Sequence, residues 1–425
     1  MDTWEKIIET VFMALLATTL GVAIAIPASF LAARNIMAPI TSPFTSVALT
    51  ILVIPAGVAL GWLAATRMGD ISQLLTGNTA LNILSLVVGP ALVWTSFRWA
   101  LPPVEERPPG RSLRIIRMIV LLLSALVGIL SLFLLANLSI TLGASLIKPL
   151  GAFGVLGKFV ATLGDILGIS IVLLSALAGA GLLGSVAGRT GQWIVEHSAP
   201  SLYRPLNLVL AAAAGATLFG LIGAGISWLY QIDNPTATLT IPAIIGGLLG
   251  VVAAALLARN ATLPIGFVLY MTTRTIFNAL RSIEALVMAI VFVVWVGIGP
   301  FAGVLALALH TIASNAKLYS EQVEAIMAGP LEAITATGAN RLQTIVYAVI
   351  PQIVPPYISY TMYRWDINVR MSTIIGFAGG GGIGFLLQQN MNLLNYRAAS
   401  AQMLAIAIVV ASMDYLSSKL REKAI

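Results

Sequence analysis

The chain contains no cysteine, only two histidines and few charged residues for its length. Without cysteine it forms no disulfide, and thiol chemistry is excluded. Charged residues make up 9% of the 425 residues, whereas soluble domains carry about 25%. Because 59% of the residues are hydrophobic and the mean hydropathy is +0.97, the composition indicates an all-α polytopic integral membrane protein.

The sequence also lacks the residue patterns of common enzymes. No arrangement of Ser, His and Asp, of Cys and His, or of paired carboxylates indicates catalysis. Residues 152–159 resemble a phosphate-binding loop, but Ala152 and Phe159 stand where that motif needs Gly and Ser or Thr. Residues 179–184 match the dinucleotide-binding pattern but lie inside a predicted span, where small residues favour close helix packing. We therefore expect no catalytic residue, cofactor, metal site or ATP site in this chain.

The apolar runs predict the number of membrane crossings. A span needs about 20 apolar residues. By this criterion the sequence predicts eleven spans, at about 7–33, 44–65, 81–98, 115–138, 168–188, 207–230, 240–258, 272–297, 301–318, 344–363 and 398–417. Residues 139–167 are rich in glycine and carry two lysines, which makes them a candidate interfacial or re-entrant segment.

The charges between the spans predict an orientation. The net charge is +7, but the basic residues are spread over the loops and form no run, so no nucleic-acid partner is expected. Arginine-rich connections, such as residues 98–114, alternate with poorer ones, as the positive-inside rule requires. Arg34 then lies in the cytoplasm, the N-terminus outside, and the basic C-terminal end in the cytoplasm. The first apolar run is too long for a cleavable signal peptide and lacks a basic leader.

One polar stretch, at about 318–343, lies between two predicted spans on the cytoplasmic side. Gly329-Pro330 is a helix-start signal, and Gly338 is a helix-stop signal. The residues between them predict a short helix outside the bilayer. The Glu332 side chain has two possible roles there, a charge-assisted hydrogen bond to a partner or a cap on its own helix start.

The spacing of this stretch is similar to that of a known motif. Glu332-Ala333, Gly338 and Ile350-Pro351 resemble the EAA loop of ABC-importer permeases, with apolar replacements at Ile334, Ala348 and Ile350. Residues 364–370 and 376–384 narrow the resemblance to the permease subunits of phosphonate, phosphate and phosphite importers. Asp366 stands where that family usually has Glu. Residues 9–35 and 274–283 resemble the same family, with Glu284 where Pro is usual.

The resemblance implies a function and a set of partners. It implies a permease that couples ATPase closure to alternating access for a small phosphorus oxyanion, namely phosphonate, phosphate or phosphite. A separate ABC ATPase subunit would hydrolyse ATP and contact Glu332, Ala333, Gly338 and Pro351. The other implied partners are an extracytoplasmic substrate-binding protein, a second permease copy in a homodimer, and membrane lipids. The implied location is the bacterial cytoplasmic (inner) membrane.

The resemblance also implies a domain division. Residues 1–35 form the first core helix, residues 266–425 form the rest of the permease core, and residues 36–265 read as a six-span insertion of unknown role. Because six is an even number, such an insertion leaves the core topology intact.

Polar residues after the tenth span are candidates for the substrate path or gate. They are Arg364, Asp366, Asn368, Arg370, Gly379, Gly380, Gly381 and Gly382. The arginines lie near a predicted span end, where charge is costly unless paired or hydrated, and Asp366 is near enough to pair with either. They are either transient partners of an anion or members of a structural pair. The glycines form a hinge or gate, an anion-binding nest, or a close helix packing site.

Two further polar residues lie in predicted spans. For Glu284 we expect an ion pair with Arg281, one turn earlier. For His310 we expect a buried, hydrogen-bonded side chain, because only one other histidine is available for a metal site or proton relay.

Two other functions stay open on the sequence. A secondary transporter or channel would work without an ATPase, but such proteins commonly show inverted repeats and intramembrane carboxylates, and this chain shows few signs of either. A membrane scaffold would suit the six unexplained spans but not the polar loop at Glu332.

Overall fold

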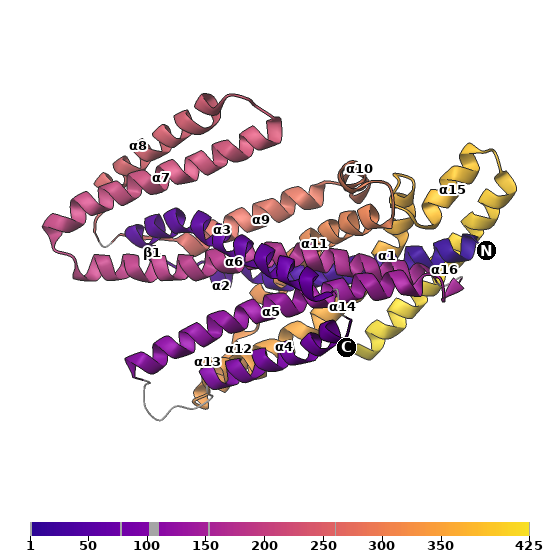
Figure 1. The fold of residues 1–425 in the computed structure, drawn as a ribbon, viewed down its shortest axis with the longest axis horizontal. Coiled ribbons are helices and arrows are strands. Elements are labelled where there is room, and N and C mark those ends of the chain that lie inside the picture. The colour runs from indigo at the N-terminus through magenta and orange to yellow at the C-terminus, as the bar shows by residue number, and fades with distance from the viewer. Residues whose placement is uncertain (1, 77–78, 102–109, 152–153, 260, 425) are drawn as a thin grey trace. The chain divides into compact units, whose positions relative to one another are not determined.

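The computed structural model describes residues 2–76, 79–101, 110–151, 154–259 and 261–424 (Figure 1). Ala152 and residues 102–109 of the charged connection at 98–114 lie outside these residues. Apart from two strands of two residues each, the regular elements described are helices, which confirms the predicted all-α class.

The chain divides into two compact units. Unit 1 consists of Met1–Thr41, Leu150–Leu156 and Pro264–Ile425, and unit 2 of Ser42–Pro149 and Gly157–Leu263. The elements of unit 1 are α1 (Asp2–Leu31), α2 (Arg34–Met37), α9 (Ile265–Ser282), α10 (Ala285–Val296), α11 (Pro300–Glu324), α12 (Ala328–Ala336), α13 (Arg341–Thr344), the π-helical turn η3 (Ile345–Val349), α14 (Ile350–Gly376), α15 (Gly382–Asn392) and α16 (Tyr396–Ala424). Those of unit 2 are β1 (Ser42–Pro43), α3 (Phe44–Thr76), α4 (Thr79–Ala100), α5 (Arg111–Leu146), most of α6 (Gly154–His197), α7 (Pro200–Tyr230), the π-helical turn η2 (Thr236–Thr240), α8 (Ile241–Leu256) and β2 (Thr262–Leu263).

Each of the eleven predicted spans coincides with helix. Among the described residues, eight helices are long and apolar enough to cross a membrane, and a bent pair, α9 with α10, brings the number to nine. The predicted spans at 81–98 and 344–363 correspond to α4 and to η3 with α14, which are helical but not among those nine.

The span predicted at 272–297 is not one straight helix. Its two parts, α9 and α10, meet at an angle of 92°. At the break Ile283 and Glu284 have extended backbone angles, with ψ of 122° and 142°. The apolar run shows no sign of this bend, because a hydropathy average does not register two extended residues between apolar ones.

Residues 139–167, considered as an interfacial or re-entrant segment, include the end of α5, to Leu146, and the start of α6, from Gly154. Both helices are long and apolar enough to cross a membrane. The glycines there serve helix packing, because a Cβ on Gly143 or Gly164 would collide with the backbone of the facing helix.

The core of unit 1 is centred on α11. In the most apolar window of α11, 61% of the residues are buried, against 39% for α1. Small residues permit this packing, since Gly21 of α1 lies directly against Thr311 and Ala308 of α11. The rings of Tyr319 and Tyr357 stack between α11 and α14, with centroids 4.0 Å apart.

Unit 2 is a bundle of long helices packed through small residues. Gly57 of α3 and Gly179 of α6 lie backbone against backbone, so the close packing predicted for the glycines at 179–184 is found at Gly179. Gly181 has no atom within 4 Å of the position that a Cβ would take. Helices α7 and α8 run side by side (Figure 1). Strands β1 and β2 pair antiparallel, with Ser42 opposite Leu263, so the chain enters and leaves unit 2 at adjacent points.

Candidate functional site

The short helix predicted outside the bilayer is α12, and it buries none of its side chains. It begins one residue before Gly329, and its first turn contains no acidic residue, so Glu332 does not cap it. The cap role considered for Glu332 was therefore wrong, because its carboxylate lies beyond the first turn. The helix ends before Gly338, whose φ of +80° is the left-handed geometry expected of a helix stop.

The segment before α12 is hydrogen-bonded to α14, and the segment after it caps the next short helix, α13. The backbone N–H of Met327, which precedes the helix, donates to Oε1 of Gln352 on α14 at 2.9 Å. After Gly338, Asn340 and Gln343 exchange backbone-to-side-chain hydrogen bonds of 2.9 Å in each direction, which is the pattern of a capping box. Pro351 lies in the first turn of α14, directly after η3. The start of the exposed helix is therefore linked to α14 by a hydrogen bond.

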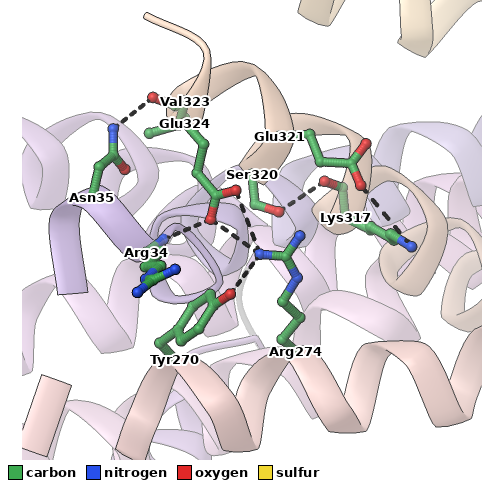
Figure 2. A network of polar contacts seen from close by, with 9 residues as sticks. All are labelled: Arg34, Asn35, Tyr270, Arg274, Lys317, Ser320, Glu321, Val323 and Glu324. Carbon is green, nitrogen blue, oxygen red and sulfur yellow. Dashed lines mark hydrogen bonds and ion pairs between the residues drawn. The ribbon is translucent and has the colours of Figure 1, made fainter. Parts of the chain in front are cut away.

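A network of polar contacts joins three elements where α11 ends, close to α12 in the sequence (Figure 2). The carboxylate of Glu324 accepts hydrogen bonds from the backbone N–H of Arg34 at 2.8 Å and from Nη1 of Arg274 at 3.1 Å. The same Nη1 donates to the hydroxyl of Tyr270 at 2.7 Å. Asn35 adds a bond of 2.8 Å from Nδ2 to the carbonyl of Val323. Glu324 thus ties the α1–α2 corner and α9 to the end of α11.

The sequence analysis did not single out Glu324 or Tyr270. Arg34 served there as an indicator of orientation, and both Arg34 and Arg274 belong to stretches that resemble the permease family. The sequence does show an acid, Glu324, at the end of one span and a base, Arg274, at the start of another. Because the two stand 50 residues apart, only the fold shows that they pair. Beside this network lies a pocket of about 360 Å³ lined by Arg34, Asn35, Ala38, Pro39 and Glu324.

The candidate residues of α14 lie within the helix and not at its end. The predicted span finishes at residue 363, and the helix that contains this residue continues to Gly376. Asp366 is 4% exposed and accepts from Nη2 of Arg370 at 2.6 Å, so the acid pairs with Arg370 and not with Arg364. Arg370 also lies 3.5 Å from the carboxylate of Asp414 on α16. The helix thus extends beyond the predicted span end, and its charged side chains are buried or paired within the protein.

Asn368 is fully buried in the core of unit 1. Its Nδ2 donates to the hydroxyls of Thr18 on α1 and Thr311 on α11, at 2.8 and 2.9 Å. In this conformation the amide of Asn368 binds three helices together and presents no free donor.

Arg364 is 8% exposed, and it forms no hydrogen bond or ion pair with the part of the chain that the structure describes. Tyr319 of α11 and Arg281 of α9 lie within electrostatic range of its guanidinium. A buried cation without a counter-ion is costly, so this position favours an anion.

A second polar group, His310 of α11, lies within electrostatic range of Arg364 and of Glu284. Its Nδ1 is buried and has no hydrogen-bond partner among the described residues. The ion pair expected between Arg281 and Glu284 is not formed, because α9 ends at Ser282 and the helical spacing is lost. The break between α9 and α10 therefore brings exposed charges close to His310 and Arg364.

The glycines at 379–382 form a tight turn that precedes α15. Three of them, Gly379, Gly381 and Gly382, have φ between +72° and +90°, where side chains are strained. Their N–H groups are largely occupied within the protein: those of Gly379 and Gly380 bond to carbonyls at the end of α14. The N–H of Gly382 bonds to Glu9 of α1 at 2.9 Å. The carboxylate of Glu9 thus occupies the place that an anion would take in a nest of these N–H groups. Of the roles considered for the glycines, close packing is the one observed.

Comparison with known proteins places these elements in a family. Residues 246–420 match the family described as the inner membrane component of binding-protein-dependent transport systems. The chain is also 37% identical over 196 residues to the phosphite transport system permease protein of Stutzerimonas stutzeri, covering 46% of this chain and 70% of that protein. The chain belongs to this family of transport permeases.

Two further permeases resemble it. A candidate cryptic phosphonate transport system permease protein of Escherichia coli is 46% identical over 118 residues, covering 28% of this chain and 97% of that protein. The phosphate-import permease protein of Mycolicibacterium smegmatis is 37% identical over 179 residues, covering 42% of this chain and 33% of that protein. The family match of this permease includes α12, the polar residues of α14 and the glycine turn.

Proposed function

We propose that this chain is the transmembrane permease subunit of an ATP-driven importer for a small phosphorus oxyanion: phosphonate, phosphate or phosphite. Family membership and the names of the three relatives support this substrate class. ATP hydrolysis belongs to a partner ABC ATPase, and an extracytoplasmic binding protein delivers the substrate. A secondary transporter or channel is the alternative, and the family match argues against it.

The observation that carries the proposal is α12. A helix of nine residues with no fully buried side chain leaves an exposed face that is available to a partner. Because the residue before the helix is hydrogen-bonded to Gln352, a push on this face reaches α14. In the proposed importer α12 is the coupling helix, with Glu332 and Ala333 on the contact face, Gly338 ending it and Pro351 at the start of the helix that receives the movement.

The Glu324 network gives the movement a second route. Glu324 stands four residues before α12 and binds α9 and the α1–α2 corner. A displacement of α12 therefore acts on α1, α9, α11 and α14 together, which is what a switch between inward-facing and outward-facing states needs.

The proposed orientation follows the charge bias, with the N-terminus outside and the C-terminus in the cytoplasm. This puts α12 in the cytoplasm, where an ATPase can reach it. Two copies of the permease would surround the path, and unit 2 would be a six-span insertion into the core formed by unit 1.

Arg364 is the residue that we assign to the substrate path. It is a buried guanidinium without a partner in its own chain, and guanidinium groups match the geometry of phosphorus oxyanions. Asn368 joins α14 to α1 and α11, and Arg370 pairs with Asp414 of α16. The glycines at 379–382 allow the turn before α15 to serve as a gate.

The test is substrate-dependent ATP hydrolysis by the permease and its ATPase reconstituted in lipid with the binding protein. We expect Glu332→Ala to lower the stimulation of ATP hydrolysis by substrate about tenfold, because it removes a charge-assisted hydrogen bond to the ATPase. Gly338→Val strains the left-handed residue and should have a similar effect. Glu196→Ala, which removes an exposed carboxylate from α6, is the matched control and should stimulate normally. Normal coupling in both α12 variants would refute the proposal.

A further inference from the structure

Unit 2 contains a pocket of about 390 Å³ that transport through unit 1 does not use. It lies between the start of α7 and the end of α8 with the segment that follows. Its polar lining is Tyr203, Arg204, Asn207 and Arg259, and its apolar lining is the stretch from Ala254 to Ala258.

One wall of the pocket is held rigidly. The guanidinium of Arg259 donates from Nη2 to the carbonyls of Val195 and Ser198, at 2.6 and 2.7 Å, and from Nε to that of Val195. It also lies over the ring of Tyr203, 4.9 Å from the centroid. Arg259 thus closes the C-terminal end of α6 and contributes positive charge without being free to move.

The floor of the pocket carries a buried donor. Asn207 is 6% exposed, and its Oδ1 accepts from the hydroxyl of Thr45 at 3.0 Å. Since Oδ1 is engaged as an acceptor, Nδ2 is fixed as the outward-facing donor. That nitrogen has no partner among the described residues, although the residue lines the pocket. An amide nitrogen held in this way favours a ligand with a hydrogen-bond acceptor atom at this position.

Arg204 supplies the mobile charge. It is exposed, lines the pocket one turn before Asn207, and forms no ion pair within the described part of the chain. No carboxylate lines the pocket. The site therefore offers two guanidinium groups and one amide donor to a ligand, and no acidic side chain.

The position of the pocket specifies the ligand further. The candidate spans Ser201–Tyr230 and Thr236–Leu256 are antiparallel neighbours, and the first begins where the second ends. The pocket is therefore at the boundary between the apolar core of a membrane and water, which is the depth of lipid headgroups. Its Ala-Leu wall suits the upper part of acyl chains.

We propose that this pocket binds the phosphate of an anionic phospholipid headgroup, with Arg204 and Asn207 as its ligands and Arg259 as fixed charge. Basic pockets between membrane helices bind such headgroups. The site is independent of the importer proposed above, and it gives unit 2 a lipid-binding role.

The experiment uses the full-length chain in nanodiscs of phosphatidylcholine with added phosphatidylglycerol, with retained lipid counted by native mass spectrometry. We expect selective retention of phosphatidylglycerol, reduced about fivefold in Arg204→Gln and largely kept in Arg204→Lys. Arg189→Gln is the matched control, because it removes an exposed arginine of α6 that does not line the pocket. Thermal unfolding of each variant checks the fold.

Three outcomes would overturn the proposal. If Arg204→Gln and Arg189→Gln lose the same amount of retained phosphatidylglycerol, the lipid is attracted by surface charge in general and not by this pocket. If phosphatidylcholine is retained as well as phosphatidylglycerol, the negative charge of the headgroup does not determine binding. Displacement of the lipid by millimolar inorganic phosphate, with phosphate held in its place, would make the site one for a free oxyanion.

Discussion

The carboxylate of Glu9 accepts a hydrogen bond of 2.9 Å from the backbone N–H of Gly382, which stands 373 positions later in the chain. The neighbouring Thr10 accepts from the N–H of Ile383 at 2.8 Å. The first helix of the chain thus supplies the N-terminal cap of α15, where unpaired N–H groups attract a negative charge.

Removing this cap should destabilise unit 1. We expect Glu9→Ala to cost about 2 kcal/mol, because the N–H of Gly382 is buried and Lys6 also loses its ion pair at 2.6 Å. The measurement is thermal unfolding of the purified chain in detergent. Glu5→Ala is the control, since it removes a carboxylate from the same helix with no contact to α15. Equal melting of the two variants would show that the cap contributes nothing.

The pair of Glu324 and Arg274 should be energetically coupled. Because both side chains are about a quarter exposed, screening limits the coupling to about 1 kcal/mol. A double-mutant cycle with Glu324→Gln and Arg274→Gln, followed by unfolding, measures it. The pair of Lys317 and Glu321, at 4.0 Å on the same helix, is the control and should give a coupling of about 0.3 kcal/mol. If the coupling is no larger than that of the control pair, the Glu324 network does not transmit the proposed movement.

Arg364 should matter for transport and not for stability. We expect Arg364→Met to lower uptake of the phosphorus oxyanion about tenfold or more, since a charge-assisted contact is lost. The melting temperature should stay the same or rise, because an unpaired buried charge is replaced by an apolar side chain of similar length. Uptake in proteoliposomes and thermal unfolding are measured together, with the exposed Arg397→Gln as control. A fall in melting temperature with unchanged uptake would give Arg364 a structural role instead.

Arg370 should show the opposite behaviour. Arg370→Met leaves the buried carboxylate of Asp366 without its partner and should cost about 2 kcal/mol, discounted because Arg370 is half exposed. Adding Asp366→Asn should restore most of the loss. The exposed partner is the control: Asp414→Asn should change unfolding by no more than about 0.5 kcal/mol. If the double variant unfolds as early as Arg370→Met alone, the loss of the Asp366–Arg370 pair does not cause the loss of stability.

The parts of the fold that depend on neighbouring residues were predictable from the sequence. Gly338 ends α12 because a helix stop needs left-handed geometry, which is a local property. The helical class and the apolar segments likewise follow from composition and from runs of about 20 residues.

The parts that depend on distant partners were not predictable. Glu9 carries no signal that it caps α15, since the two meet only in the fold. The end of α14 was placed too early because Arg364 and Asp366 look like boundary residues, while the protein around them makes a buried helix. The bend at Ile283 depends on two backbone angles that hydropathy does not encode.

The bond between Glu9 and Gly382 also sets an order of events during synthesis. At translation rates of about 5–20 residues per second, the 373 residues between them take about 20–75 s to make. During that time the helices of unit 2 are produced, while α1 waits in the membrane without α11, α14 or α15. Helix α1 is therefore made long before the helices that lock it in place, and unit 2 is complete before unit 1 can close.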